Sequence, residues 1–216
     1  DLPLRQSSEG RLGVVLHNGY GLTQASPTIS RTIYAKGSGE VESGPPIPGV
    51  EVRIVDQDGR IVLDDTPGEL HVRGPNVMIG YYRQPELTTA IIDAGGFLNT
   101  GDIVSRRSTG ELVVQGRSKE LIIRSGFNVY PPEIEGVLNA HVSVLNSAVV
   151  GRRVEGNEEI IAFVEPAPGI AIDVHELLAY LEARLARYKK PQQIIFLPHL
   201  PVAPNGKILK GELKRQ

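Results

Sequence analysis

The chain has 216 residues, a formal net charge of −2 and no cysteine, and 40% of its residues are hydrophobic. This apolar share suffices for a buried core and excludes a disordered chain, while the near-neutral charge excludes a general electrostatic attraction to nucleic acid or anionic membranes. Without cysteine there are no disulfides or thiolate metal sites, and no apolar run approaches the roughly 20 residues that span a bilayer, so we expect a soluble cytoplasmic protein without a transmembrane segment.

The first half of the chain places short β-like runs between turns rich in glycine and proline. Residues 50–55 and 69–73 alternate between apolar and polar side chains, which suits strands with one buried face. Further strands are expected at 61–63 and 111–114, with one short helix near 85–92. Closely spaced strands of this kind predict a small antiparallel β-barrel.

From about Arg117 the chain changes to longer elements that alternate between strands and helices, which predicts a small α+β domain. Proline is tolerated in a first helical turn, so Pro131 indicates a helix start. Asp173 can cap a second helix, with Glu176 completing a capping box. The apolar residues of that helix are expected on one face, at Val174, Leu177, Leu178, Leu181 and Leu185. Strands are expected at 121–123, 147–150, 160–164 and 194–197, the second and third of them central in their sheet.

Segment 18–24, with the sequence NGYGLTQ, carries side chains suited to binding a nucleotide. Gly19 and Gly21 let the backbone approach a flat ligand while the ring of Tyr20 stacks on it. The hydroxyl of Thr23 can donate to a phosphate or reach a metal. Taken alone, the segment is more often a turn with a core tyrosine.

Three further polar segments are each a weak indication of function when taken alone. Asp102, expected in a turn formed by residues 100–102, can accept two hydrogen bonds from a sugar diol. Arg117 can contact ribose or phosphate through its planar guanidinium, and Lys207 lies at the tip of an expected Asn-Gly turn. The alternatives are an ordinary turn aspartate for Asp102, a solvated charge cluster around Arg117 and a solvated surface lysine for Lys207.

In their order and spacing, these segments resemble the adenylate-forming superfamily of acyl-CoA synthetases, carrier-protein adenylation domains and luciferases. The resemblance covers nearly the whole chain and indicates the C-terminal portion of such an enzyme. The amino-acid sequence of residues 125–135 is most similar to that of fatty-acyl-CoA synthetases. The matching stretches are YGLT at 20–23, GEL at 68–70, GYY at 80–82, TGD at 100–102, GRSKELI at 116–122, GFNVYPPEIE at 126–135 and GKILK at 206–210.

The resemblance implies an ATP site in the first half of the chain. Tyr20 would stack on the adenine ring, and Asn18 would meet the adenine amino group. Asp102 and Arg117 would hold the ribose hydroxyls. The full set of implied nucleotide-binding residues is Asn18, Gly19, Tyr20, Gly21, Asp102 and Arg117.

The resemblance also assigns residues to the reaction itself. Thr23 would touch phosphate, and Lys207 would bridge the acyl carboxylate and the α-phosphate during adenylation. Lys119 falls at the hinge about which the small domain swings between half-reactions. Ser125 and Gly126 would belong to the loop that faces the pantetheine arm of coenzyme A.

The chain departs from the family pattern in two ways. Gln24 stands where the family usually has a glutamate that binds magnesium, and an uncharged amide oxygen predicts weaker Mg²⁺ binding. The family's Ser/Thr/Gly-rich phosphate loop, with its lysine, and most residues of the acyl pocket are not found in this sequence. We therefore expect that an N-terminal part of the same protein is missing, and that the isolated chain is inactive.

The resemblance implies an α+β protein with two parts. Residues 1–116 would end a large N-terminal domain and contain the adenine segment and the barrel, and residues 117–216 would form a mobile C-terminal α+β domain. The implied enzyme is an ATP- and Mg²⁺-dependent acyl-CoA synthetase that activates a carboxylic acid, most readily a fatty acid, as acyl-AMP and transfers it to coenzyme A. No nucleic acid partner is expected. The sequence identifies neither the acyl group nor the oligomeric state.

Two alternatives stay open at this point. One is an enzyme that transfers the acyl group to a carrier-protein thiol or stops at acyl-AMP. The other is a non-catalytic fragment that binds nucleotides or a partner protein.

Overall fold

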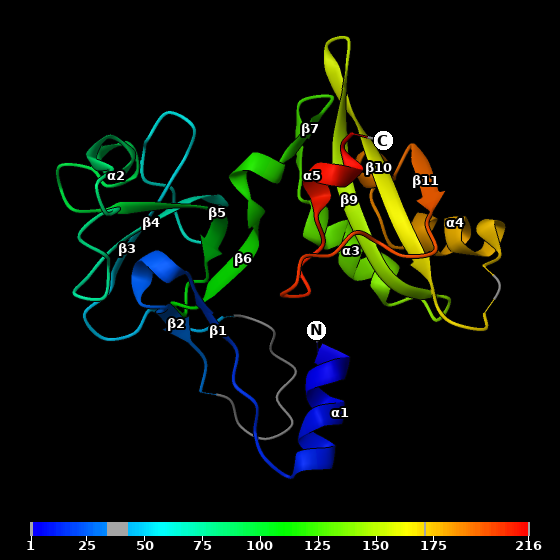
Figure 1. The fold of residues 1–216 in the computed structure, drawn as a ribbon, viewed down its shortest axis with the longest axis horizontal. Coiled ribbons are helices and arrows are strands. Elements are labelled where there is room, and N and C mark those ends of the chain that lie inside the picture. The colour runs from blue at the N-terminus through cyan, green and yellow to red at the C-terminus, as the bar shows by residue number, and fades with distance from the viewer. Residues whose placement is uncertain (1, 34–42, 171, 216) are drawn as a thin grey trace. The chain divides into compact units, whose positions relative to one another are not determined.

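The computed structural model describes residues 2–33, 43–170 and 172–215. The chain divides into two compact units, unit 1 (Asp1–Ser118) and unit 2 (Lys119–Gln216), whose helices and strands are shown in Figure 1. Within the described residues, no helix is long and apolar enough to cross a bilayer.

The elements of unit 1 are α1 (Leu2–Leu12), β1 (Gly19–Gly21), η1 (Thr23–Ala25), β2 (Thr28–Arg31), β3 (Glu51–Val55), β4 (Gly68–Arg73), α2 (Pro85–Ile91), β5 (Leu98–Arg106) and β6 (Leu112–Arg117). The elements that follow are η2 (Ser118–Glu120), β7 (Ile122–Arg124), β8 (Phe127–Val129), α3 (Pro131–Asn139), β9 (Val144–Val154), β10 (Asn157–Pro166), α4 (Val174–Glu182), η3 (Arg187–Lys189), β11 (Gln193–Phe196) and α5 (Lys210–Leu213).

The largest sheet of unit 1 is antiparallel, with four strands in the order β3-β4-β5-β6. Strand β4 alternates as predicted, with Gly68, Leu70 and Val72 buried and their neighbours half-buried. The two apolar side chains join the core of this unit, which includes Ile29 and Leu98. The α+β class is confirmed. The barrel is not, because the pairings of the described residues join these strands into an open sheet.

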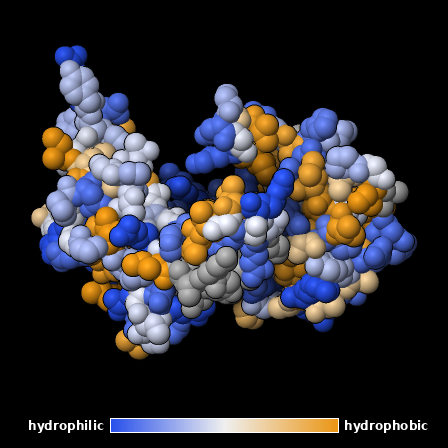
Figure 2. All heavy atoms as spheres, turned by 90° about the horizontal axis from the view of Figure 1, so that it is seen from below, coloured by the Kyte–Doolittle hydropathy of each residue, from blue (hydrophilic) through white to orange (hydrophobic). Residues whose placement is uncertain are grey.

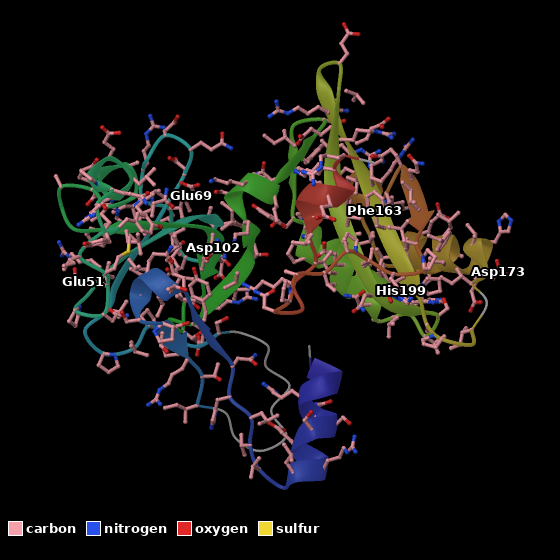
Figure 3. All side chains as sticks on the ribbon, viewed as in Figure 1. Glu51, Glu69, Asp102, Phe163, Asp173 and His199 are labelled. Atoms are coloured by element: carbon pink, nitrogen blue, oxygen red, sulfur yellow. The ribbon has the colours of Figure 1, made fainter. Side chains whose placement is uncertain are left out.

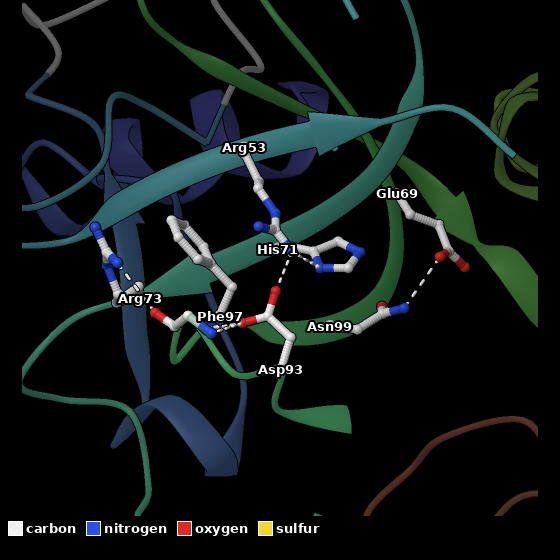
Figure 4. A network of polar contacts seen from close by, with 8 residues as sticks. Arg53, Glu69, His71, Arg73, Asp93, Phe97 and Asn99 are labelled. Atoms are coloured by element: carbon white, nitrogen blue, oxygen red, sulfur yellow. Dashed lines mark hydrogen bonds and ion pairs between the residues drawn. The ribbon is translucent and has the colours of Figure 1, made fainter. Parts of the chain in front are cut away.

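The outer face of this sheet carries a polar network (Figure 4). The ring of Phe97 lies between two guanidinium groups, 4.3 Å from that of Arg53 and 4.5 Å from that of Arg73. Arg73 also pairs with Glu51 on the adjacent strand at 2.6 Å, and Arg53 pairs with Asp93. Exposed pairs of this kind are screened by solvent and contribute little to stability. The network therefore accounts for charged residues on a sheet face and does not indicate a ligand site.

Several expectations for unit 1 need correction. The strand expected at 61–63 is reduced to a single bridge between Ile61 and Val55. Helix α1 was not expected, because its sequence contains a glycine and two serines and lacks an apolar stripe. The expected helix near 85–92 is confirmed as α2.

The larger sheet of unit 2 has three strands in the order β11-β10-β9, and β10 is parallel to β11 and antiparallel to β9. Its central strand β10 is buried on both faces, with α3 and α4 on one side and α5 on the other (Figure 1). Ile160 and Val164 pack into the core formed with α3 and α4. Phe163, labelled in Figure 3, packs on the opposite face with Leu200 and Leu213. Burial on both faces explains why this strand is a continuous apolar run.

Strand β9 was expected to be central, but it lies at an edge of this sheet. Its residues 147–150 are nevertheless buried. The outward N–H group of Val149 donates a hydrogen bond to the Glu135 carboxylate over 2.7 Å. The side chain from α3 thus satisfies a backbone group that a neighbouring strand would otherwise pair.

Helix α4 begins at the predicted cap residue. Asp173 is its N-cap, and its Oδ1 atom accepts hydrogen bonds from the backbone N–H groups of His175 and Glu176, at 2.8 and 3.2 Å. These contacts satisfy donors that the first helical turn leaves without a partner.

The predicted apolar face of α4 was too wide. Leu177, Leu181 and Leu185 are buried, but Val174 and Leu178 are 42% and 41% exposed. The helix is short, and a narrow stripe suffices to pack it on the sheet. Figure 2 shows other apolar side chains exposed among hydrophilic ones.

We expect Asp173→Ala to lower the free energy of unfolding of unit 2 by about 1 kcal/mol, because the cap acceptor is lost. Asp173→Asn keeps an acceptor oxygen and serves as the matched control, with little expected change. Urea denaturation followed by circular dichroism measures both. Equal destabilisation by the two substitutions would contradict the capping role.

Candidate functional site

Side chains from three strands of unit 1 meet at the carboxylate of Asp102, which is labelled in Figure 3. Tyr20 of β1 donates its hydroxyl hydrogen bond to Asp102 Oδ2 over 2.5 Å. Arg117, the last residue of β6, places Nε 2.9 Å from Asp102 Oδ1 and lies opposite Asp102 in the β5–β6 pairing. The Asp102 side chain is 6% exposed and that of Arg117 is 56% exposed. Asp102 is thus a buried acceptor beneath a guanidinium that reaches solvent.

Residues 100–102 were expected in a turn, and the structure places them inside β5 instead. The β4–β5 register shifts here, since Glu69 faces Ile103 whereas His71 faces Asn99. At this shift β5 has more residues than the facing part of β4, and Gly101 is one of these extra residues. It adopts a φ of 69°. Such irregularities re-aim a side chain and often lie beside functional sites.

A hydroxyl group fixes the backbone of this irregular segment. Thr100 Oγ1 accepts a hydrogen bond from the N–H group of Asp102 at 3.1 Å and donates one to the carbonyl of Leu70 at 2.8 Å. The sequence interpretation gave Thr100 no role. A threonine hydroxyl can accept a hydrogen bond from the backbone N–H group two residues later. This spacing between Thr100 and Asp102 is the signal in the sequence that could have identified the role of Thr100.

The electrostatics of the cluster keep Tyr20 as the donor. Burial and the hydrogen bond to Asp102 raise the pKa of the Tyr20 phenol above its usual range, so it retains its proton at neutral pH. A carboxylate has about four lone-pair positions. Asp102 can therefore accept further hydrogen bonds from a bound hydroxyl group.

The backbone around Tyr20 is held by β2 and its neighbouring chain. Asn18 donates its N–H group to Thr32 Oγ1 at 2.8 Å, and its carbonyl accepts from the N–H group of Thr32 at 2.9 Å. Gly21 pairs with Thr28, and a Cβ atom added to it would lie 1.7 Å from the carbonyl oxygen of Pro27. At Gly19 the nearest atom would be 3.5 Å away. Of these two glycines, Gly21 is the one that close approach requires.

Thr23 and Gln24 lie together in η1, directly after β1. Thr23 is exposed. Gln24 donates a hydrogen bond from Nε2 to the hydroxyl group of Tyr81 at 2.9 Å. The amide is thereby oriented, and its Oε1 atom is the one suited to a cation. Tyr81 belongs to a matching stretch of the sequence, but its contact with Gln24 could not be foreseen from spacing.

Lys207 lies in unit 2 on an exposed turn. The N–H group of Ala203 donates to the carbonyl of Lys207 at 2.8 Å, and the N–H group of Lys207 donates to Asn205 Oδ1 at 3.2 Å. Gly206 has a φ of 80°, as the Asn-Gly pair predicts. The backbone of the turn is ordered while the lysine side chain faces solvent.

Ser125 and Gly126 form the two-residue turn of the β7–β8 hairpin, with φ values of 51° and 81°. Two consecutive positive φ values are typical of a tight hairpin turn. The N–H group of Ser125 donates to Asn157 Oδ1 at 2.8 Å. Lys119, the expected hinge residue, is exposed in η2 and is the first residue of unit 2.

The structure thus brings Tyr20, Asp102 and Arg117 into direct contact and places Asn18 to Gln24 on one continuous segment of the same unit. Lys119, Ser125 and Lys207 belong to unit 2.

Two family models match the chain. The AMP-binding enzyme model matches residues 3–82, and the AMP-binding enzyme C-terminal domain model matches residues 133–207. The segment around Tyr20 lies in the first match, and Lys207 is the last residue of the second.

The chain is similar to a long-chain-fatty-acid–CoA ligase of Yersinia pestis, with 40% identity over 202 residues that cover 94% of this chain and 36% of that protein. It is also similar to 4-coumarate–CoA ligase 1 of Oryza sativa subsp. japonica, with 37% identity over 211 residues that cover 94% of this chain and 37% of that protein. The crystal structure of ATP-bound MatB from Rhodopseudomonas palustris matches 99% of this chain and 43% of its own, with a TM-score of 0.89 and 32% identity. The chain therefore spans less than half the length of each of these relatives.

Proposed function

Since this chain belongs to the AMP-binding enzyme family, we propose that it supplies the C-terminal part of an ATP-dependent acyl-CoA ligase. In the proposed reaction a carboxylate attacks the α-phosphate of ATP, which gives acyl-AMP and pyrophosphate. The thiol of coenzyme A then attacks the acyl carbon, forms the thioester and releases AMP. We propose a fatty acid as the substrate because residues 125–135 are most similar to fatty-acyl-CoA synthetases.

The observation that carries this proposal is the buried carboxylate of Asp102, held by Tyr20 on one oxygen and Arg117 on the other. In the proposed ATP complex, Asp102 and Arg117 hold the ribose hydroxyls, for which a carboxylate and a guanidinium provide acceptors and donors. The same contacts fix the Tyr20 ring, which stacks on adenine. An ordinary turn aspartate would not need two partners from separate strands.

The remaining proposed ATP contacts lie on the segment that contains β1 and η1. Asn18 meets the adenine amino group beside Gly19 and Gly21, and Thr23 follows with an exposed hydroxyl for phosphate. The pairing of β1 with β2 and the bonds between Asn18 and Thr32 support this assignment, because they fix the backbone of the segment.

Lys207 is the proposed source of positive charge in the adenylation step. Its neighbour Lys210 forms ion pairs at 2.7 and 2.9 Å with Glu120 and Glu135, so that ammonium group is already engaged. Lys207 is exposed on an ordered turn and is the better candidate for charge shared between the carboxylate and the α-phosphate.

The acceptor step is assigned to the β7–β8 turn. We propose that Ser125 and Gly126 face the pantetheine arm of coenzyme A, and that unit 2 turns about Lys119 between the two half-reactions. The side chains of this turn are small, which suits a segment that lies beside the narrow pantetheine arm.

The proposed metal is Mg²⁺, which accompanies ATP and neutralises phosphate charge. Gln24 offers an amide oxygen, and Thr23 lies beside it with a hydroxyl group. Both are hard oxygen donors of the kind that Mg²⁺ prefers, although neither carries a charge.

We expect Gln24→Glu to lower the Mg²⁺ concentration at half-saturation by up to about tenfold, because a charged ligand replaces a neutral one. The Tyr81 hydroxyl, now paired with the Gln24 amide at 2.9 Å, can donate to the new carboxylate and keep it in place. A magnesium titration of ATP–pyrophosphate exchange measures the effect in the longer protein that contains this chain. Gln57→Glu makes the same change in an exposed turn and is the matched control. An unchanged or raised half-saturation would place Gln24 away from the metal.

The proposed function is tested by ATP–pyrophosphate exchange in the longer protein, screened against carboxylic acids of graded length. We expect acid-dependent exchange, and AMP release once coenzyme A is added. Exchange without release on adding coenzyme A would indicate a different acceptor, such as a carrier protein. No acid-dependent exchange would overturn the proposal.

A further inference from the structure

An ion cluster in unit 2 joins three separate segments of the chain. The ammonium group of Lys210 lies 2.7 Å from Glu120 Oε2 and 2.9 Å from Glu135 Oε1. The side chains of Lys210 and Glu135 are 20% and 16% exposed, and that of Glu120 is 34% exposed. A largely buried charge of this kind is costly to leave without its partners, so the three groups depend on one another.

The cluster links the beginning of unit 2 to its C-terminal segment. Glu120 is in η2, directly after Lys119. Lys210 is the first residue of α5, three positions after Lys207. Glu135, in α3, also accepts the backbone N–H group of Val149 at 2.7 Å, which fixes it to the sheet.

The other contacts of the C-terminal segment are mainly apolar or lie within the segment. Ile208 packs against the core around Phe163, and the turn at Lys207 is closed by hydrogen bonds with Ala203 and Asn205. Leu200 and Leu213 are buried at its two ends. Between them lie a bridge from Val202 to Ile208 and a hydrogen bond from the N–H group of Leu209 to the carbonyl of Pro201 at 2.8 Å. The ion cluster is thus the charged contact that ties the region beside Lys207 to η2 and α3.

The charge of Lys210 is stable in this environment. Burial lowers the pKa of its ammonium group, but Glu135 and Glu120 outweigh that effect and leave the pKa above its usual range. Lys210 is therefore a fixed cation and has no free electron pair for chemistry at neutral pH.

We propose that Lys210 is a positioning residue, which ties the turn that carries Lys207 to the hinge-side segment at Glu120 through a shared ion cluster. The proposal rests on the proposed function, in which Lys207 acts in adenylation. Lys210 itself touches no reactant. Its role is to make the Lys207 turn follow the segment that begins unit 2, so that turning about Lys119 delivers the Lys207 ammonium group to a fixed place.

The first experiment needs no activity and uses the chain itself. Hydrogen exchange is compared for the wild type, Lys210→Met and the matched control Lys214→Met, which removes an exposed charge four residues further on. We expect the backbone amides of Ala203 and of residues 205–209 to exchange at least about tenfold faster in Lys210→Met, with the amides of β10 unchanged and the control like the wild type. Unchanged exchange at 203–209 would overturn the proposal, and so would equal acceleration throughout unit 2.

The second experiment measures the two half-reactions in the longer protein. Lys210→Met is expected to slow adenylation by about tenfold, since small misplacements of a reacting group have effects up to about 100-fold. Transfer from supplied acyl-AMP to coenzyme A should be unchanged, and Lys210→Arg should restore most of the adenylation rate because arginine keeps the charge. Equal loss in both half-reactions, or no recovery with arginine, would make Lys210 a merely structural residue and overturn the proposal.

The two experiments separate failure of this inference from failure of the proposed function. If the wild type shows no acid-dependent exchange of pyrophosphate, the proposed function fails whatever Lys210 does. If the wild type is active and Lys210→Met adenylates normally, only the positioning role fails.

Discussion

In the proposed acyl-CoA ligase, Lys207→Ala is expected to slow adenylation by about two to three orders of magnitude. The estimate follows from the roughly 3–4 kcal/mol that a well-placed charged or hydrogen-bonding group contributes to a transition state. The step brings a carboxylate against a phosphate, and the exposed ammonium group on the turn of residues 203–207 would offset the shared negative charge. Transfer of the acyl group from supplied acyl-AMP to coenzyme A should be nearly unchanged.

Separate assays of the two half-reactions give the decisive comparison. Lys214→Ala is the matched control, because it removes an exposed lysine from the same C-terminal segment, and it should leave both rates near those of the wild type. Equal loss in both half-reactions would indicate misfolding or a purely binding role for Lys207. No loss in either would leave it an ordinary surface lysine.

Gly21→Ala is expected to destabilise unit 1 by about 3 kcal/mol, the upper end of the usual range for overpacking. The new methyl group would lie 1.7 Å from the carbonyl oxygen of Pro27 and 2.7 Å from its carbonyl carbon. These are backbone atoms, so the strands must move apart. The displacement would also disturb Tyr20, which precedes Gly21 and bonds to Asp102.

Gly19→Ala makes the same substitution in the same strand and is a close control. Its methyl group would meet only an ordinary contact at 3.5 Å, and glycine in a strand is destabilising by about 0.5–1 kcal/mol relative to alanine. Stability should therefore be unchanged or slightly increased, as measured by thermal or urea unfolding. Similar destabilisation by both substitutions would contradict the close approach at Gly21.

The sequence was informative where one local rule decides the structure. Alternation predicted β4 and the continuous apolar run predicted β10, because burial on one face or on both leaves a direct pattern in the residues. Asp173 was identifiable as a cap, since its contacts lie within three residues. Helix α1 escaped prediction because no local rule favours it.

The candidate site was harder to predict, because its contacts join residues distant in sequence. The spacing of residues 100–102 suggested a turn, whereas the β4–β5 pairing places Asp102 inside a strand irregularity. The bond from Tyr20 to Asp102 spans 82 positions. Tyr20 and Asp102 lie in separate sheets that share one core, so their contact depends on tertiary packing and no property of either residue alone predicts it.

The C-terminal segment has a consequence for the fate of shortened chains. Leu200 and Leu213 cover the face of the sheet that bears Phe163, and Lys207 lies between them. A premature stop codon before Leu200 would therefore expose an apolar sheet face as it removes the lysine. Such a product would be a substrate for chaperones and proteases, which act on exposed apolar surface.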